Sequence, residues 1–99
     1  MLYTGKEIVV RIRSHMKKRG GANTNWFVGV SKDARARLFV QHHVRKKGDS
    51  WILVHAKSSQ VARKVKSYLV KKLGISGGAD AESDADFVYA YRKRSHTKP

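Results

Sequence analysis

The stretch NWFVGVSKDARARLF, residues 25–39, decides the fold that the sequence predicts. Its first six residues are mostly aromatic or β-branched, which is typical of a strand. Ser31 or Asp33 can then cap a helix from about residue 32 to residue 43, in which Ala34 and Leu38 share one face. We therefore expect a strand that passes through a tight turn directly into a helix.

Three more strands are expected around this unit. In KEIVVRIR, residues 6–13, a period of two places Ile8, Val10 and Ile12 on one side and Arg11 and Arg13 on the other. Residues 14–24 then form a turn that returns the chain as a hairpin with strand 25–30. SWILVHA, residues 50–56, is apolar enough to be a central strand. FVYAYR, residues 87–92, alternates tyrosines with small apolar residues, so one of its two faces is expected to meet solvent.

A second helix is expected from Ser58 or Ser59 to Leu73, because Val61, Val65 and Leu69 recur at helical spacing and Gly74 follows. The predicted element order is ββαβαβ, an α+β fold with a mainly antiparallel sheet and two packed helices. We expect one domain over residues 1–94 and a flexible basic tail over residues 95–99.

Charge is the most informative property of the composition. The chain has 22 Lys and Arg against 7 Asp and Glu, a net charge of +15 over 99 residues, and both halves are basic. A polyanion is the natural partner for such a surface, and nucleic acid is the commonest polyanion. The chain has no cysteine, which excludes disulfides and thiolate metal sites, and no apolar run of the ~20 residues that a membrane span needs. We expect a cytoplasmic protein that binds no membrane.

The strand, turn and helix of residues 25–43 resemble the GIY-YIG nuclease domain, and the resemblance covers roughly residues 6–73 in element order as well as motif. It looks closest to the small stand-alone members of the family, whose chains also end in a VYAY-like strand. In that family, a Tyr-Ile-Gly-type strand leads into a helix with a catalytic arginine, a histidine often follows, and a glutamate on the next helix binds the metal. Here "FVG" ends at Gly29, and Arg37 lies eight residues after this glycine, at the position of the family's arginine. His42 lies near the position of the family's histidine. The resemblance implies catalytic roles for Arg37 and His42 in an active member.

Three features depart from that pattern. Phe27 replaces the motif's tyrosine, the segment 6–13 lacks the Gly-Ile-Tyr signature, and Lys66 stands at the position of the metal-binding glutamate. A lysine repels Mg²⁺ and attracts phosphate. The resemblance, with these departures, implies a nuclease scaffold that has become a binding surface, with no bound cofactor or metal.

The sequence thus predicts a nucleic-acid-binding module, with DNA favoured over RNA, that grips the phosphate backbone by charge. The residues expected to make these contacts are Lys17, Lys18, Arg19, Arg35, Arg37, Arg45, Lys46, Lys47, Arg63 and Lys66. Two alternatives stay open: an active Mg²⁺-dependent endonuclease with a divergent residue set, and a basic protein that binds an acidic protein partner. The sequence leaves the oligomeric state open.

Aromatic and acidic residues permit further roles. Trp26 and Trp51 can stack on bases or pack in the core, and packing is favoured. Tyr89 and Tyr91 form a stacking platform if their face meets solvent. The acidic residues of segment 77–86 can keep the loop solvated or fold back on the basic surface, and we favour both over a metal site.

Overall fold

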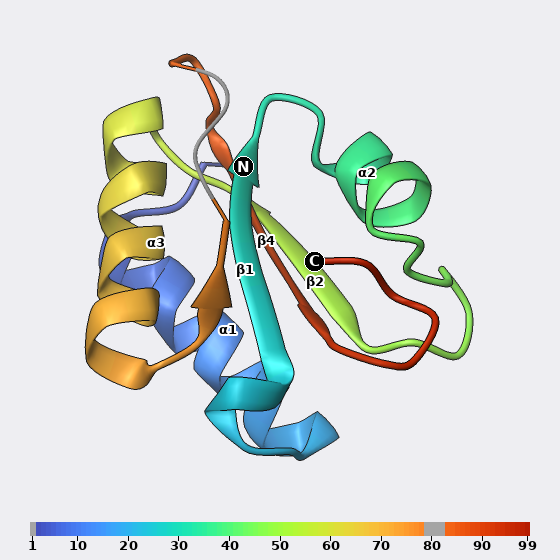
Figure 1. Ribbon diagram of the computed structural model, residues 1–99. Coiled ribbons are helices and arrows are strands. Elements are labelled where there is room, and N and C mark those ends of the chain that lie inside the picture. The colour runs from blue at the N-terminus through green and yellow to red at the C-terminus, as the bar shows by residue number, and fades with distance from the viewer. Residues whose placement is uncertain (1, 79–82) are drawn as a thin grey trace.

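The computed structural model describes residues 2–78 and 83–99 as an α+β fold. A four-stranded mixed sheet has the strand order β2-β4-β1-β3 and carries helices on both faces (Figure 1). The elements are α1 (Gly5–Arg19), β1 (Trp26–Ser31), α2 (Ala34–Ala36), η2 (Arg37–Gln41), β2 (Trp51–His55), α3 (Ser59–Leu73), β3 (Ser76–Gly77) and β4 (Phe87–Arg92), with a short 3₁₀ turn at Asn23–Asn25. Among the residues described, no helix is both long and apolar enough to cross a membrane.

The N-terminal segment is a helix, so the predicted strand at 6–13 and its hairpin are wrong. Thr4 and Glu7 form a capping box, with the Thr4 amide donating to the Glu7 carboxylate (2.9 Å) and the Glu7 amide to the Thr4 hydroxyl (3.2 Å). The buried residues Ile8, Ile12 and Met16 are four apart, whereas Val10, which the strand pattern placed with them, is 57% exposed.

The partner of β1 is therefore not an N-terminal strand but β4, at the C-terminal end of the chain. These two strands pair antiparallel, with Gly29 opposite Tyr89 and Phe27 opposite Tyr91. β4 also pairs antiparallel with β2, and β3 adds a short parallel edge to β1. The predicted order ββαβαβ is replaced by αβαβαββ, and the predicted strands at β1, β2 and β4 are confirmed.

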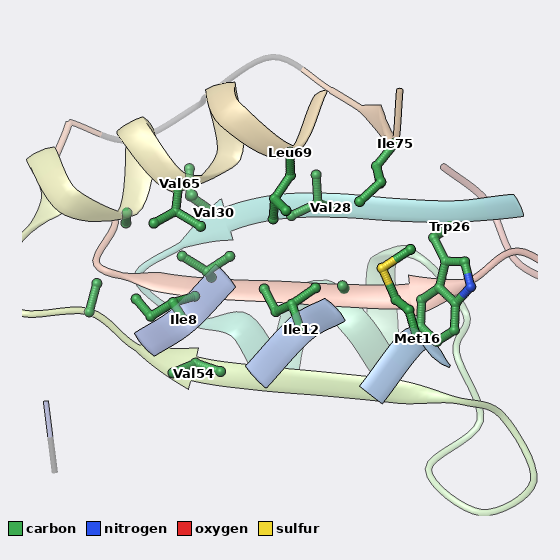
Figure 2. Close-up of a cluster of buried hydrophobic side chains, with 14 of the residues drawn as sticks. Ile8, Ile12, Met16, Trp26, Val28, Val30, Val54, Val65, Leu69 and Ile75 are labelled. Carbon is green, nitrogen blue, oxygen red and sulfur yellow. The ribbon is translucent and has the colours of Figure 1, made fainter. Parts of the chain in front are cut away.

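Two hydrophobic layers hold the sheet between its helices. On one face, α1 and α3 pack against the strands; Figure 2 shows Ile8, Ile12, Val65 and Leu69 pointing at the sheet, and Trp26 completing this layer at one end. On the other face, α2 and the segment after it cover a second layer, which includes Tyr89 and Tyr91 of β4. Because both faces are covered, neither side of β4 meets solvent, contrary to the expectation.

The predicted second helix is confirmed as α3. The Ser58 hydroxyl accepts from the Val61 amide (3.1 Å), and Gly74 ends the helix in the left-handed conformation (φ 71°). The predicted helix at 32–43 is shorter, because the single turn of α2 widens into the π-type turn η2 and His43 then adopts φ 58°.

The C-terminal segment, for which a flexible basic tail was expected, makes hydrogen bonds to the body on the α2 side of the sheet. The Lys98 amide donates to the His42 carbonyl oxygen (2.8 Å), and His96 Nε2 lies 2.6 Å from an Asp49 carboxylate oxygen. Thr97, which stands between His96 and Lys98 in the sequence, is buried.

Candidate nucleic-acid interface

The predicted contact residues fall into three places. Lys17, Lys18 and Arg19 form the last turn of α1, and the loop of residues 45–47 precedes β2. Arg35 and Arg37 belong to α2 and η2, on the other side of the sheet from Arg63 and Lys66 of α3 (Figure 1). One phosphate therefore cannot meet both Arg37 and Lys66 from the same face.

The first place is a cavity of about 360 Å³, which we call the sheet-end pocket, between the C-terminal turn of α1 and the start of β2. Arg19 and Lys46 both line it, although they belong to basic runs that are far apart in the sequence. The other side chains that define the pocket are His15, Asp49, Ser50 and Trp51. The fold thus joins two of the predicted basic runs at one concave site.

Asp49 is the carboxylate in this wall, and its oxygens are already engaged. The Arg45 amide donates to its Oδ2 (2.7 Å), His96 Nε2 lies 2.6 Å from the same oxygen, and the side chain is only 5% exposed. Burial raises the pKa of Asp49, but these hydrogen bonds and the charges of His96 and Arg45 outweigh it and leave the pKa lowered. Asp49 is therefore an anion that fixes the loop, while the cations Arg19 and Lys46 remain to act on a ligand.

His15 adds a polar group without a charge at neutral pH. Burial and the neighbouring Arg19 and Lys18 lower its pKa, and its ring meets that of Trp26 edge to face, 5.7 Å between centroids. Within residues 2–78 and 83–99, its buried Nε2 has no hydrogen-bond partner. An unpaired buried nitrogen of this kind costs stability.

Two further cations extend the basic surface at this end of the sheet. β4 ends at Arg92, whose Nη1 lies 3.4 Å from the Arg19 carbonyl oxygen, and Lys93 follows it. The sequence gives little sign of this proximity, because it depends on the pairing of β4 with β1.

The second place is the turn that carries Arg37 and His42. The His42 amide donates to the Arg37 carbonyl oxygen (2.8 Å), so the π-type turn brings the two residues that the resemblance singled out close together. His42 is 8% exposed, and its ring meets the hydroxyls of Tyr89 and Tyr91 beneath the turn. We call His42, Tyr89 and Tyr91 the buried polar cluster.

The hydrogen bonds of this cluster define one tautomer. The Lys98 carbonyl oxygen, 2.6 Å from His42 Nδ1, can only accept, so Nδ1 carries the proton. Nε2 then accepts from the Tyr89 hydroxyl (2.8 Å). Burial lowers the pKa of His42; the hydrogen bond to the Lys98 carbonyl opposes this shift, and the charge of Arg37 adds to it. Burial raises the pKa of Tyr91. The cluster is therefore neutral and closed at pH 7.

The cluster also explains the glycine of the opening stretch. A Cβ atom on Gly29 would lie 2.4 Å from the Tyr89 hydroxyl oxygen, closer than any real contact. Tyr89 is buried and crosses directly over β1 at this point. Gly29 is thus required by packing, and its φ angle is not positive. Tyr89 and Tyr91 are both buried, so the condition for a tyrosine stacking platform, a ring face that meets solvent, is not met.

The third place is the outer side of α3. Lys66 is 8% exposed and its ammonium donates to the Gly78 carbonyl oxygen, so it holds the β3 edge and is not a surface cation. Arg63 is half-buried and its Nη1 donates to the Ser83 carbonyl oxygen (2.8 Å). Lys64 and Lys71 are exposed on the same helix.

The remaining expectations concern aromatic and acidic groups. Trp26 is fully buried and donates to the Gly20 carbonyl oxygen (3.1 Å), so packing is confirmed. Asp84 pairs with Lys32 (3.1 Å) and Asp86 with His55 (2.7 Å), while Asp80 and Glu82 lie outside the described residues. In the part of the chain that is described, no three His, Asp or Glu side chains gather as a metal site would require.

Comparisons of the chain with protein-family models, with curated proteins and with solved structures give no significant match.

Proposed function

We propose that the protein is a nucleic-acid-binding module whose main contact surface is the basic end of the sheet around the sheet-end pocket. The observation that carries this proposal is the meeting of Arg19 and Lys46 at one concave site. Lys17, Lys18, Arg45 and Lys47, the other cations of the two runs, are exposed.

Charge supports the same conclusion. A net charge of +15 on a domain of 99 residues opposes compaction, and a polyanion relieves this self-repulsion. Contacts to about six to ten phosphates make the affinity fall steeply with salt. None of the helices in the described part of the chain presents an obvious set of base-reading side chains, as a sequence-specific protein does. We infer electrostatic binding of the backbone, with DNA favoured over RNA and a cytoplasmic location.

The scaffold we propose is a degenerate GIY-YIG-like one in which the partner of the Phe-Val-Gly strand comes from the C-terminus. β4 pairs with β1 where the resemblance led us to expect residues 6–13. The scaffold contributes little to the binding surface, because His42 is enclosed and Lys66 holds an edge strand. Both side chains are only 8% exposed, so we do not assign a phosphate contact to His42 or to Lys66.

A titration of labelled DNA and RNA with the protein at two salt concentrations, with Mg²⁺ or with EDTA, tests this function. We expect retention without fragments, weaker at the higher salt and indifferent to the metal. The double variant Arg19→Ala/Lys46→Ala should bind less tightly. Its charge-matched control is Lys64→Ala/Lys71→Ala on α3, which should bind almost as the wild type does. Absence of retention at both salts would refute the proposal and favour the acidic protein partner.

One observation favours endonuclease activity as the second candidate. The pairing of β4 with β1 brings the Tyr89 hydroxyl to His42, on the turn that carries Arg37. A phosphodiester could reach these groups only if the turn opened, since the cluster is buried. Mg²⁺-dependent fragments that disappear in Arg37→Ala and in Tyr89→Phe would establish this activity.

A further inference from the structure

We propose that the sheet-end pocket receives one nucleotide of a single strand, with its base against Trp51 and its phosphate between Arg19 and Lys46. This inference rests on the proposed function and gives it a substrate class. It depends on Trp51 and two cations, Arg19 and Lys46, which together line one cavity. Aromatic rings and cationic side chains in one groove are the usual means by which proteins bind unpaired bases.

The indole of Trp51 is held in place from two sides. Its Nε1 donates to the Lys46 carbonyl oxygen (3.1 Å), and its ring meets Phe39 edge to face, 5.0 Å between centroids at 85°. The first contact also fixes the backbone from which the Lys46 side chain leaves. A ring and a cation in a fixed relation reduce the ordering cost of binding a ligand that touches both.

The size and charge of the pocket suit a nucleotide. Its volume of about 360 Å³ falls in the range of small-ligand sites, roughly 300–1,000 Å³. The Asp49 carboxylate is turned to its own partners and is 5% exposed, so it opposes an incoming phosphate weakly. Arg19 offers a planar fork of donors, which is suited to phosphate oxygens.

A second cavity of the molecule provides the contrast. It measures about 450 Å³ and lies along α1, where Val9, Val10 and Leu73 contribute apolar walls beside Arg13 and Lys17. None of the described residues that line it is aromatic. It offers cations but no stacking surface, so the base preference belongs to the sheet-end pocket.

The pocket also distinguishes single strands from duplexes. A paired base is stacked inside the helix, and bringing it to Trp51 requires unstacking it at a cost of a few kcal/mol. An unpaired base pays little of this cost. We therefore expect the protein to prefer single-stranded to duplex nucleic acid of the same length and charge at moderate salt.

Tryptophan fluorescence tests this proposal in the wild-type protein. The chain has two tryptophans, and Trp26 is fully buried, so a ligand in the pocket should quench Trp51. The probes are a 12-nucleotide oligodeoxyadenylate and a 12-base-pair duplex, both titrated at two salt concentrations. We expect the single strand to quench, and Trp51→Phe to lose the quenching. Trp51→Leu should weaken single-strand binding about 5- to 150-fold, the range for one stacked base.

The outcomes separate this inference from the proposed function. Equal retention of the two probes with unchanged Trp51 emission would refute the nucleotide pocket and leave the electrostatic module standing. Retention of neither probe would refute the proposed function and the pocket together. Quenching that persists in Trp51→Phe would mean that the ligand acts elsewhere, which also refutes the pocket. A thermal melt of each variant verifies that it is folded.

Discussion

The buried polar cluster and the sheet-end pocket are both built from polar and aromatic side chains, but they differ in what their polar groups contact. In the cluster, His42, Tyr89 and Tyr91 satisfy one another and the Lys98 carbonyl. In the pocket, Arg19 and Lys46 stand beside a cavity, and His15 keeps a buried nitrogen without a partner in the described chain. The comparison teaches that the paired polar groups of the cluster stabilise the fold, whereas the exposed cations of the pocket are available to a ligand.

The largest effect is expected from filling the space above Gly29. Gly29→Ala puts a methyl group 2.4 Å from the Tyr89 hydroxyl and forces the ring off His42. We expect the free energy of unfolding to fall by about 2–3 kcal/mol, as overpacking does in a tight core. Denaturant titration measures it.

The matched control is Gly5→Ala in α1, where the new methyl would meet Val65 at 3.4 Å, an ordinary contact. Its effect on the unfolding free energy should stay below about 1 kcal/mol in either direction. Equal effects of the two substitutions would show that the approach of Tyr89 to β1 is not a constraint.

A smaller loss is expected when the cluster loses one donor. Tyr89→Phe removes the hydroxyl that His42 Nε2 accepts from and leaves this buried nitrogen unpaired. The unfolding free energy should fall by about 1–3 kcal/mol. Affinity for DNA should stay within twofold of wild type, because the cluster is closed to ligand. A stable Tyr89→Phe protein that no longer retains DNA would contradict the division between the two regions.

The pocket should behave in the opposite way. Arg19→Ala/Lys46→Ala should lower the affinity for DNA about tenfold, equivalent to ~1.4 kcal/mol, and reduce the salt slope by about two. Its melting temperature should change little, because neither side chain is buried. The control Lys64→Ala/Lys71→Ala removes the same charge from α3. An equal loss of affinity in both variants would mean that binding follows net charge alone.

The smallest effect is expected from pH. The pKa values of His15 and His42 are lowered in the folded protein, chiefly by burial, from the ordinary value of 6.5. Below about pH 6.5 the unfolded chain therefore binds more protons, and stability falls as the pH drops through the folded-state values. Melting temperatures at pH 8, 7, 6 and 5 should decline, and less so in His15→Gln. A decline that is unchanged in His15→Gln would remove His15 from this explanation.

Much of the fold was predictable where local pattern and burial agree. The Val61, Val65 and Leu69 stripe with Gly74 marks α3, and the apolar runs mark β1 and β2. Residues 6–13 failed because Ile8 and Ile12 satisfy both a strand and a helix period. The deciding signal was the capping box of Thr4 and Glu7, which sequence reasoning overlooked.

The candidate site was predictable in composition but not in assembly. The basic runs at 17–19 and 45–47 were identified, yet their meeting at one pocket depends on long-range packing. The enclosure of His42 and of Tyr89 depends on the second layer of side chains under α2, which periodicity in one strand cannot reveal. Lys66 was misjudged for the same reason, because a two-residue parallel pairing at β3 is invisible in the sequence.

The measurement that tests the central claim most directly is the salt-dependent titration of DNA with the wild type, Arg19→Ala/Lys46→Ala and Lys64→Ala/Lys71→Ala. The sheet-end surface predicts retention by the wild type, a tenfold loss in the first variant with a shallower salt slope, and near wild-type binding by the second. Identical curves for the two variants, or no retention by any of the three proteins, would contradict it.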